Sequence, residues 1–415
     1  MDSFYVSGGD GVKRYAVLGA GFAGVAVAYH LLEMAKRRVQ VEVYDMCGIA
    51  AGASGASAGL LHPYSVKGKV MWRGREAMAS AMHLVKAAKA AASRLTGDDA
   101  QVICWRHGLV RVAQTRKQVS GFRQIKPPTG GRNNGHPLAI SLQEAQRLIP
   151  GLTAGDWMRE DEAVEDTACL WIPDGAVLHP RRYLAALWEA CQELGRRTGS
   201  RATLVVEKVS SLEELESARG PFDAVIVAAG ATVDSLQELK GMLPLNLCQG
   251  CTMALESTGL PDAPLYPEAA PSLLGPTYMA AHGRDRLVIG ATSTYGWTTE
   301  AALGEIGKGL VPVRECEHDV SGLGAAAGRL WPLAREWGVA GVRSGVRALP
   351  PRTEDGAVPL VGKVEGCGPG RSWWVVAGLG ARGILYHAWL SQLVAQAVHL
   401  GSESNIPAAL LRWKR

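Results

Sequence analysis

The sequence predicts an α/β fold with a second, mainly antiparallel β-sheet domain, and three observations lead to this prediction. One glycine turn separates an apolar strand from a helix near residue 20, and another separates a strand from a long helix near residue 380. Between them, residues 245–292 contain alternating segments typical of an antiparallel sheet. A chain of 415 residues is also too long for one compact core, which favours two domains.

The first glycine turn lies in residues 14–45, which have the order strand, turn, helix, strand and acidic residue. Gly19, Gly21 and Gly24 have the spacing G-x-G-x-x-G. Such glycines allow a tight turn, close approach of a pyrophosphate and close helix packing, while the helix N-terminus attracts the phosphates. Asp45 ends the second strand, where a carboxylate can accept hydrogen bonds from an adenosine ribose. The unit predicts a Rossmann-like dinucleotide site.

The second glycine turn repeats this spacing at Gly378, Gly380 and Gly383. No second strand with an acidic residue follows its helix, so we expect both turns to contact one cofactor. A cofactor held at both ends favours FAD over NAD.

Several other interpretations are less favoured. Residues 15–32 are apolar enough to suggest a membrane span, but their glycines and the charged strand that follows favour a buried strand and helix. The polar first eleven residues do not resemble a secretory signal, so we expect a cytoplasmic protein, with an organelle matrix or stroma as an alternative. Cys248 and Cys251 form a C-x-x-C pair without a second pair or a nearby His, so we predict no metal site.

Two further segments carry alternatives. Residues 55–59 match the G-x-S-x-G motif of hydrolases, but no strand directly precedes them, so we expect these small residues to surround a cofactor instead. Residues 101–143 contain no Asp or Glu and form either a solvated basic face or a surface for a polyanion. The cationic residues of this basic segment are Arg106, Arg111, Arg116, Lys117, Arg123, Lys126 and Arg132.

With its two glycine turns, the small-residue loop at residues 53–59 and the apolar strand ending at Gly230, the chain resembles the D-amino-acid-oxidase superfamily of FAD-dependent oxidoreductases. The resemblance implies a glycine-oxidase-like fold: a discontinuous FAD-binding domain (12–98, 165–235 and 340–415) and a substrate domain (99–164 and 236–339). It also implies non-covalent FAD, because no Cys lies between Arg347 and Cys367.

The residues that this resemblance places around the cofactor come from five segments. They are Gly19, Ala20, Gly21, Phe22, Ala23, Gly24 and Asp45; Ala53, Ser54, Gly55, Ser57, Ala58, Gly59 and Leu60; Val209; Ala229 and Gly230; and Gly380, Ala381, Arg382, Gly383 and Ile384.

The implied reaction is oxidation of a C–N bond of a small amino acid or secondary amine by hydride transfer to flavin N5, and it needs an anchor for a carboxylate. Arg347 is the first candidate, with Arg343 and Arg352 as alternatives nearby. Arg382 is a second candidate, and it could instead contact the flavin. His62, Tyr64 and, more weakly, Tyr278 are candidates for lining the site.

Three motifs are most similar to the flavin half of the bacterial bifunctional tRNA wobble-uridine modification enzyme: 52–64, 345–362 and 378–385. This resemblance implies an alternative function, removal of a carboxymethyl group from a tRNA uridine held by residues 101–143. A flavoprotein that acts as an assembly or binding factor without turnover is a further alternative. The sequence indicates neither the electron acceptor nor the oligomeric state.

Overall fold

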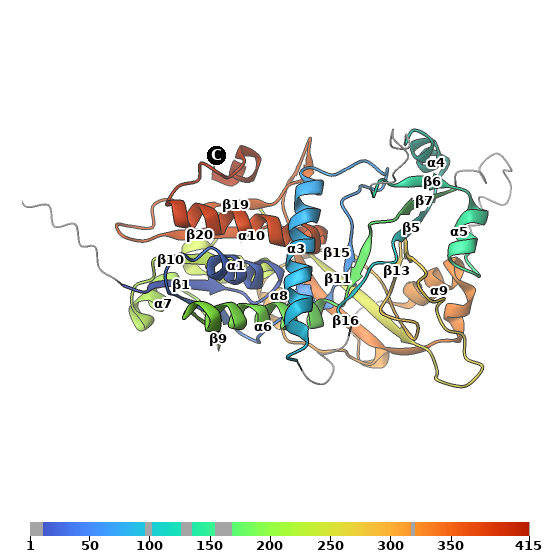
Figure 1. The fold of residues 1–415 in the computed structure, drawn as a ribbon, viewed down its shortest axis with the longest axis horizontal. Coiled ribbons are helices and arrows are strands. Elements are labelled where there is room, and N and C mark those ends of the chain that lie inside the picture. Colours follow the sequence, from blue (N-terminus) through green and yellow to red (C-terminus); the bar gives the residue numbers. More distant parts are fainter. Residues whose placement is uncertain (1–10, 96–101, 126–134, 154–167, 317–319, 415) are drawn as a thin grey trace, which may run out of the picture.

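A computed structural model describes residues 11–95, 102–125, 135–153, 168–316 and 320–414. Figure 1 shows two sheets side by side along the longest axis, with helix α3 (Gly74–Ala92) upright between them. This arrangement confirms the predicted α/β fold with a second, largely antiparallel sheet.

The first sheet has six strands and contains both glycine turns. Its order is β19 (Leu360–Lys363), β20 (Trp373–Ala377), β10 (Ala224–Val227), β1 (Lys13–Leu18), β2 (Val39–Asp45) and β9 (Arg201–Val206). All neighbouring pairs are parallel except β19–β20. The two glycine turns therefore follow the carboxyl ends of β1 and β20, two strands apart, where such sheets bind ligands.

Both faces of this sheet are covered, which explains its continuous apolar strands. Tyr15 and Val17 of β1 pack in a core with α1 (Phe22–Glu33), α3, α6 (Pro180–Thr198) and α10 (Gly383–Leu400). Ala16 and Leu18 face the opposite core, which includes α7 (Leu212–Arg219). Helix α1 is buried at every position from Phe22 to Leu32, so the apolar run at 15–32 is a core strand followed by a core helix. Among the described residues, no helix is long and apolar enough to cross a membrane.

The second sheet has nine strands. Its path is β15 (Thr294–Trp297), β11 (Asn246–Glu256), β14 (Arg286–Gly290), β13 (Tyr278–Ala281), β12 (Ser272–Leu274), β5 (Leu109–Val112), β7 (Cys169–Ile172) and β6 (Leu138–Ile140), with β16 (Gly338–Leu349) paired to β11. Within it only the β12–β5 pair is parallel among the described strands. Nearby helices are α4 (Arg116–Arg123), α5 (Leu142–Leu148) and α9 (Ser321–Leu330).

Short elements connect the two sheets. A small sheet contains β3 (Leu60–Leu61), β8 (Ala176–Leu178) and β4 (Cys104–Trp105), and a hairpin contains β17 (Arg352–Thr353) and β18 (Gly356–Ala357). Helix α2 (Ala53–Ala56) lies in the small-residue loop, and α8 (Thr299–Glu305) lies near β16.

Sheet pairing divides the chain differently from the predicted domain boundaries in two places. The strand β7, expected in the first domain, pairs with β5 and β6 of the second sheet. The strand β16, most of which was also expected in the first domain, pairs with β11 along its length. Both strands are apolar or alternating, and such patterns do not specify a pairing partner. Residues 102–113 alternate in sequence like a single strand, but Gly108, with a left-handed φ of 78°, separates β4 from β5.

The packing of α1 against β1 gives a first prediction. A Cβ at position 24 would lie 1.7 Å from the carbonyl oxygen of Gly19, inside van der Waals contact. We expect Gly24→Ala to lower the free energy of unfolding by about 1–3 kcal/mol and to weaken FAD retention. Urea unfolding and flavin content after gel filtration measure these effects. The matched control is Gly121→Ala in α4, where the new methyl group has no neighbour within 4 Å; equal losses in both variants would contradict the packing argument.

Candidate active site

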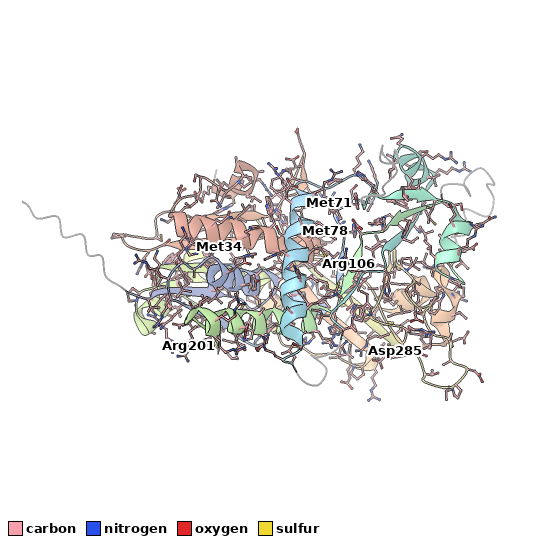
Figure 2. All side chains as sticks on the ribbon, in the orientation of Figure 1. Met34, Met71, Met78, Arg106, Arg201 and Asp285 are labelled. Atoms are coloured by element: carbon pink, nitrogen blue, oxygen red, sulfur yellow. The ribbon has the colours of Figure 1, made fainter. Side chains whose placement is uncertain are left out.

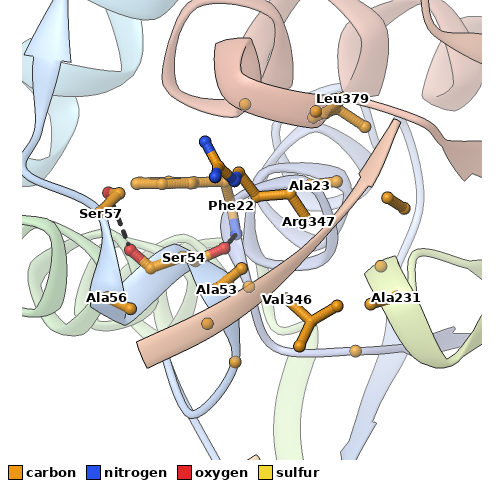
Figure 3. A pocket seen from close by; sticks show the side chains of 18 of the residues that line it. Phe22, Ala23, Ala53, Ser54, Ala56, Ser57, Ala231, Val346, Arg347 and Leu379 are labelled. Carbon is orange, nitrogen blue, oxygen red and sulfur yellow. Dashed lines mark hydrogen bonds between the residues drawn. The ribbon is translucent and has the colours of Figure 1, made fainter. Parts of the chain in front are cut away.

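A cavity of ≈ 490 Å³ lies where the two sheets meet. It is lined by the turn between β1 and α1, the loop around α2, the segment after β10, strands β11 and β16, and the turn before α10. Figure 3 shows α2, the start of α1 and strand β16 around this cavity. Segments from both ends of the chain therefore enclose one site.

The first glycine turn leaves room for a ligand at the start of α1. Gly19 has a φ of 105°, and a Cβ there would lie 2.5 Å from the carbonyl oxygen of Ala228. A Cβ on Gly21 would lie 2.7 Å from Ser54 Oγ, which accepts a hydrogen bond from Phe22 N at 3.0 Å. Gly21 is the N-cap and supplies no capping side chain, so Ser54 Oγ, bound to Phe22 N, is the side-chain acceptor that the described residues provide at this helix end, which faces the cavity. This cradle matches the space and polarity that the pyrophosphate of FAD needs.

Asp45 lines the cavity, but it also supports the turn itself. Its Oδ2 accepts a hydrogen bond from Ala20 N at 2.8 Å, and its Oδ1 accepts two from Cys47 N and Gly48 N, both at 2.9 Å. A carboxylate has about four acceptor positions, so one remains for a ribose hydroxyl. The expected contact between Asp45 and the ribose stays a prediction. The structure shows in addition that Asp45 holds the backbone of the turn in place.

The second glycine turn faces the same cavity. Gly378 and Gly380 have φ values of 69° and 54°, and residues 380–382 form a 3₁₀ turn before α10. Gly383 begins α10 beside Phe22, and a Cβ at position 383 would lie 3.7 Å from a carbon of the Phe22 ring. The structure thus brings both turns to one site, as expected for a single cofactor.

Three arginines line this cavity: Arg111, Arg347 and Arg382. None of them forms an ion pair with a carboxylate among the described residues. Arg347 Nη2 donates to Thr292 O at 3.1 Å and Ser293 Oγ at 3.2 Å, while its Nε has no partner in the described part of the chain. Figure 3 shows its side chain extending from β16 into the cavity. Unpaired guanidinium groups indicate an anionic ligand.

His62 lies beside these arginines and is fully buried. Burial and the charges of Arg382 and Arg111 hold its pKa well below the usual 6.5, so its imidazole is neutral at neutral pH. Its Nδ1 accepts a hydrogen bond from Tyr64 N at 3.2 Å, which places the single ring proton on Nε2. That Nε2 lies 3.4 Å from Arg382 Nη1. Since both groups are then donors, an acceptor from a ligand would stabilise the pair.

Residues 14–397 match the family described as DAO, FAD dependent oxidoreductase. The chain belongs to this family. FAD is therefore its cofactor, and the cavity described above has the glycine cradle and the helix N-terminus that such a cofactor requires.

Individual relatives support the same fold. A curated glycine oxidase from Geobacillus kaustophilus (strain HTA426) is 26% identical over 392 residues, which cover 92% of each chain. The crystal structure of a glycine oxidase from G. kaustophilus has a TM-score of 0.68 at 23% identity, covering 94% of this chain and 95% of that one. The crystal structure of iminodiacetate oxidase from Chelativorans sp. BNC1 also has a TM-score of 0.68, at 24% identity, covering 95% and 97%.

Most residues predicted around FAD line the cavity of this family member. The exceptions are Ala20, Gly24 and Gly55, which act through packing and backbone contacts instead. For the others, contact with FAD stays a prediction.

The side chains predicted to anchor the substrate or line the site fall into two groups, inside and outside the cavity. Arg347, Arg382, His62 and Tyr278 line the cavity, whereas Arg343, Arg352 and Tyr64 do not. Arg352 is exposed in β17, and the hydroxyl of Tyr64 donates to Gly135 O at 3.0 Å.

The sequence did not indicate two parts of the site. Arg111 was grouped with surface cations, but its side chain is buried because β5 lies inside the second sheet. Helix α8 also contributes cavity-lining residues, including Ala302 and Glu305. Its seven residues carried no motif, and only the tertiary fold brings them to the cofactor cavity.

The buried state of His62 gives a pH prediction. Above pH 6.5 both the folded and the unfolded chain have a neutral imidazole at this position. Below pH 6.5 the unfolded chain gains a proton that buried His62 does not accept, so folding stability falls by up to about 1.4 kcal/mol per pH unit. We expect the stability of His62→Gln to fall less steeply than that of wild type between pH 6.5 and 5. Urea unfolding at each pH measures the slope.

The control is His107→Gln, which replaces an imidazole that is exposed to solvent. A slope of His62→Gln as steep as that of wild type would show that His62 is not held neutral by the fold.

Proposed function

We propose that this protein uses FAD to oxidise a C–N bond of a small amino acid or secondary amine that carries an α-carboxylate. The observation that carries the proposal is Arg347, a cavity-lining guanidinium without a carboxylate partner among the described residues. The names of the relatives support it, since both a glycine oxidase and an iminodiacetate oxidase act on amines of this kind.

Two glycines allow Arg347 and Tyr278 to reach the substrate position. A Cβ on Gly250 would lie 2.5 Å from Arg347 Nη2, so the glycine leaves space for this side chain across β11. A Cβ on Gly290 would lie 2.7 Å from the hydroxyl oxygen of Tyr278. The two side chains are close enough for the charge of Arg347 to act on the phenol. Together they offer a guanidinium and a hydroxyl to one carboxylate.

When bound, FAD supplies the hydride acceptor, and the imine that results from the amine is hydrolysed by water. The protein's own contribution is to anchor the carboxylate, orient the α-carbon and hold the amine in a cationic environment that favours its neutral form. Arg347 and Arg382 provide that environment, and no acid–base group is needed for the hydride step itself. An arginine that anchors the carboxylate in this way controls substrate affinity.

The test replaces the anchor and compares it with a neighbour. We expect Arg347→Met to lower kcat/KM for sarcosine by about 10²- to 10³-fold, mainly through KM, because a charge-assisted pair with the carboxylate is lost. Arg352→Met is the control, since Arg352 is exposed and outside the cavity. Steady-state assays with an artificial electron acceptor measure both. Equal activity of the two variants would refute Arg347 as the anchor.

A second candidate function is oxidative removal of a carboxymethyl group from a tRNA wobble uridine. The observation that favours it is the exposure of Arg106, Arg116, Lys117 and Arg123 in the basic segment, although Arg111 is buried, and Lys126 and Arg132 lie outside the described residues. Absence of tRNA binding at low ionic strength would exclude it.

An assembly or binding factor without turnover is the remaining alternative. Catalytic reduction of an electron acceptor by any of glycine, sarcosine or iminodiacetate would exclude this function.

A further inference from the structure

Arg111 is the least expected charged group of the cavity. Its side chain is 7% exposed, it lines the cavity, and its Nε has no partner among the described residues. Burial and the neighbouring Arg382 lower its pKa to about 10, so it is still a cation at neutral pH. A buried cation without a counter-charge is costly, and a bound anion offsets that cost.

Three side chains that donate hydrogen bonds line the cavity near Arg111: Arg111 itself, Arg382 and His62. The Arg382 guanidinium and the Nε2–H of His62 lie 3.4 Å apart, and the charge of Arg111 acts on His62 while that of Arg382 acts on Arg111. No carboxylate among the described residues pairs with either arginine. We call Arg111, Arg382 and His62 the second cationic cluster. Two guanidinium groups and an imidazole N–H are donors suited to a carboxylate.

The second cluster and the Arg347 anchor lie toward different ends of one sheet face. Arg347 lies on β16, which pairs with β11, and the strand order continues through β14, β13 and β12 to β5. Residues paired across neighbouring strands share a face. Arg111 on β5 is paired with Leu274 on β12, and both line the cavity.

Tyr278, by contrast, turns toward the anchor. It is paired with Gly290 on β14, and its hydroxyl lies over that glycine, on the side of β11. Tyr278 and Arg111 stand two strands apart, about 10 Å between backbones, so each cluster can hold its own anion.

We propose that the second cationic cluster binds a second carboxylate, so that the preferred substrate is a secondary amine with a carboxylate on each side of the nitrogen. This inference rests on the proposed function and names its substrate class. One carboxylate contacts Arg347 and Tyr278, and the other contacts Arg111 with Arg382 and His62. The oxidised C–H bond lies between the two.

The test uses a matched pair of substrates. Iminodiacetate and sarcosine both contain an N-carboxymethyl group, and they differ only in having a second carboxymethyl group or a methyl group on nitrogen. We expect wild type to favour iminodiacetate in kcat/KM, and Arg111→Met to reduce that preference on the order of 10- to 100-fold. The value for sarcosine should change by less than about 3-fold. Arg111→Lys should restore part of the preference.

The control variant is Arg106→Met, which removes an exposed cation from the same basic segment (Figure 2) and should leave both substrates unchanged. If Arg111→Met lowers activity toward both substrates equally, or shifts the flavin reduction potential instead, Arg111 serves the cofactor and the proposal is wrong. A wild-type preference for sarcosine would also overturn it.

A binding measurement separates this inference from the proposed function. Thiodiacetate and (methylthio)acetate replace the amine by sulfur and differ by the same second carboxylate. Calorimetry on the FAD-loaded protein should show tighter binding of thiodiacetate, and Arg111→Met should remove the difference. That result would stand even if no amine were oxidised. Equal affinities of the two thioethers in wild type would refute the second carboxylate site whatever the activity.

Discussion

The structure depends on the close approach of backbones at the glycine turn between β1 and α1. Gly24 rests against the carbonyl of Gly19, and Gly19 rests against that of Ala228, with no space for a Cβ at either position. This contact fixes the start of α1 at the carboxyl edge of the first sheet. Because the N-terminus of this helix is directed at the cavity, the same contact supports both the packing and the predicted phosphate site.

A second constraint is charge without counter-charge. Arg111, Arg347 and Arg382 converge on one cavity, and the structure pairs none of them with a carboxylate in its described residues. A fold that served stability alone would pair or expose such groups. We therefore infer that these arginines, which lack a carboxylate partner among the described residues, bind an anionic ligand. His62 is consistent with this view, since its neutrality leaves a donor rather than another charge.

The sequence predicted the fold and the meeting of the two glycine turns at one cavity because both depend on local patterns. The spacing of Gly19, Gly21 and Gly24 specifies a tight turn that leaves space for a phosphate. The second glycine turn could be assigned to the same cofactor because no strand with an acidic residue follows its helix. Arg111 could not be found in this way. Its burial depends on β5 lying between β12 and β7, which are distant in the chain, and alternating segments do not specify such neighbours. The same reason explains why the sequence did not indicate that β7 and β16 pair in the second sheet.

The central claim is that the cavity holds FAD next to an amine anchored by its carboxylate. Anaerobic titration of the FAD-loaded protein with glycine, sarcosine and iminodiacetate tests it directly, because only hydride transfer from a bound amine bleaches the oxidised flavin band. The account predicts bleaching by at least one of these amines and none by methylamine or dimethylamine, which lack a carboxylate. A flavin that stays oxidised with all three carboxylates, or that is bleached equally well by the simple amines, would contradict it.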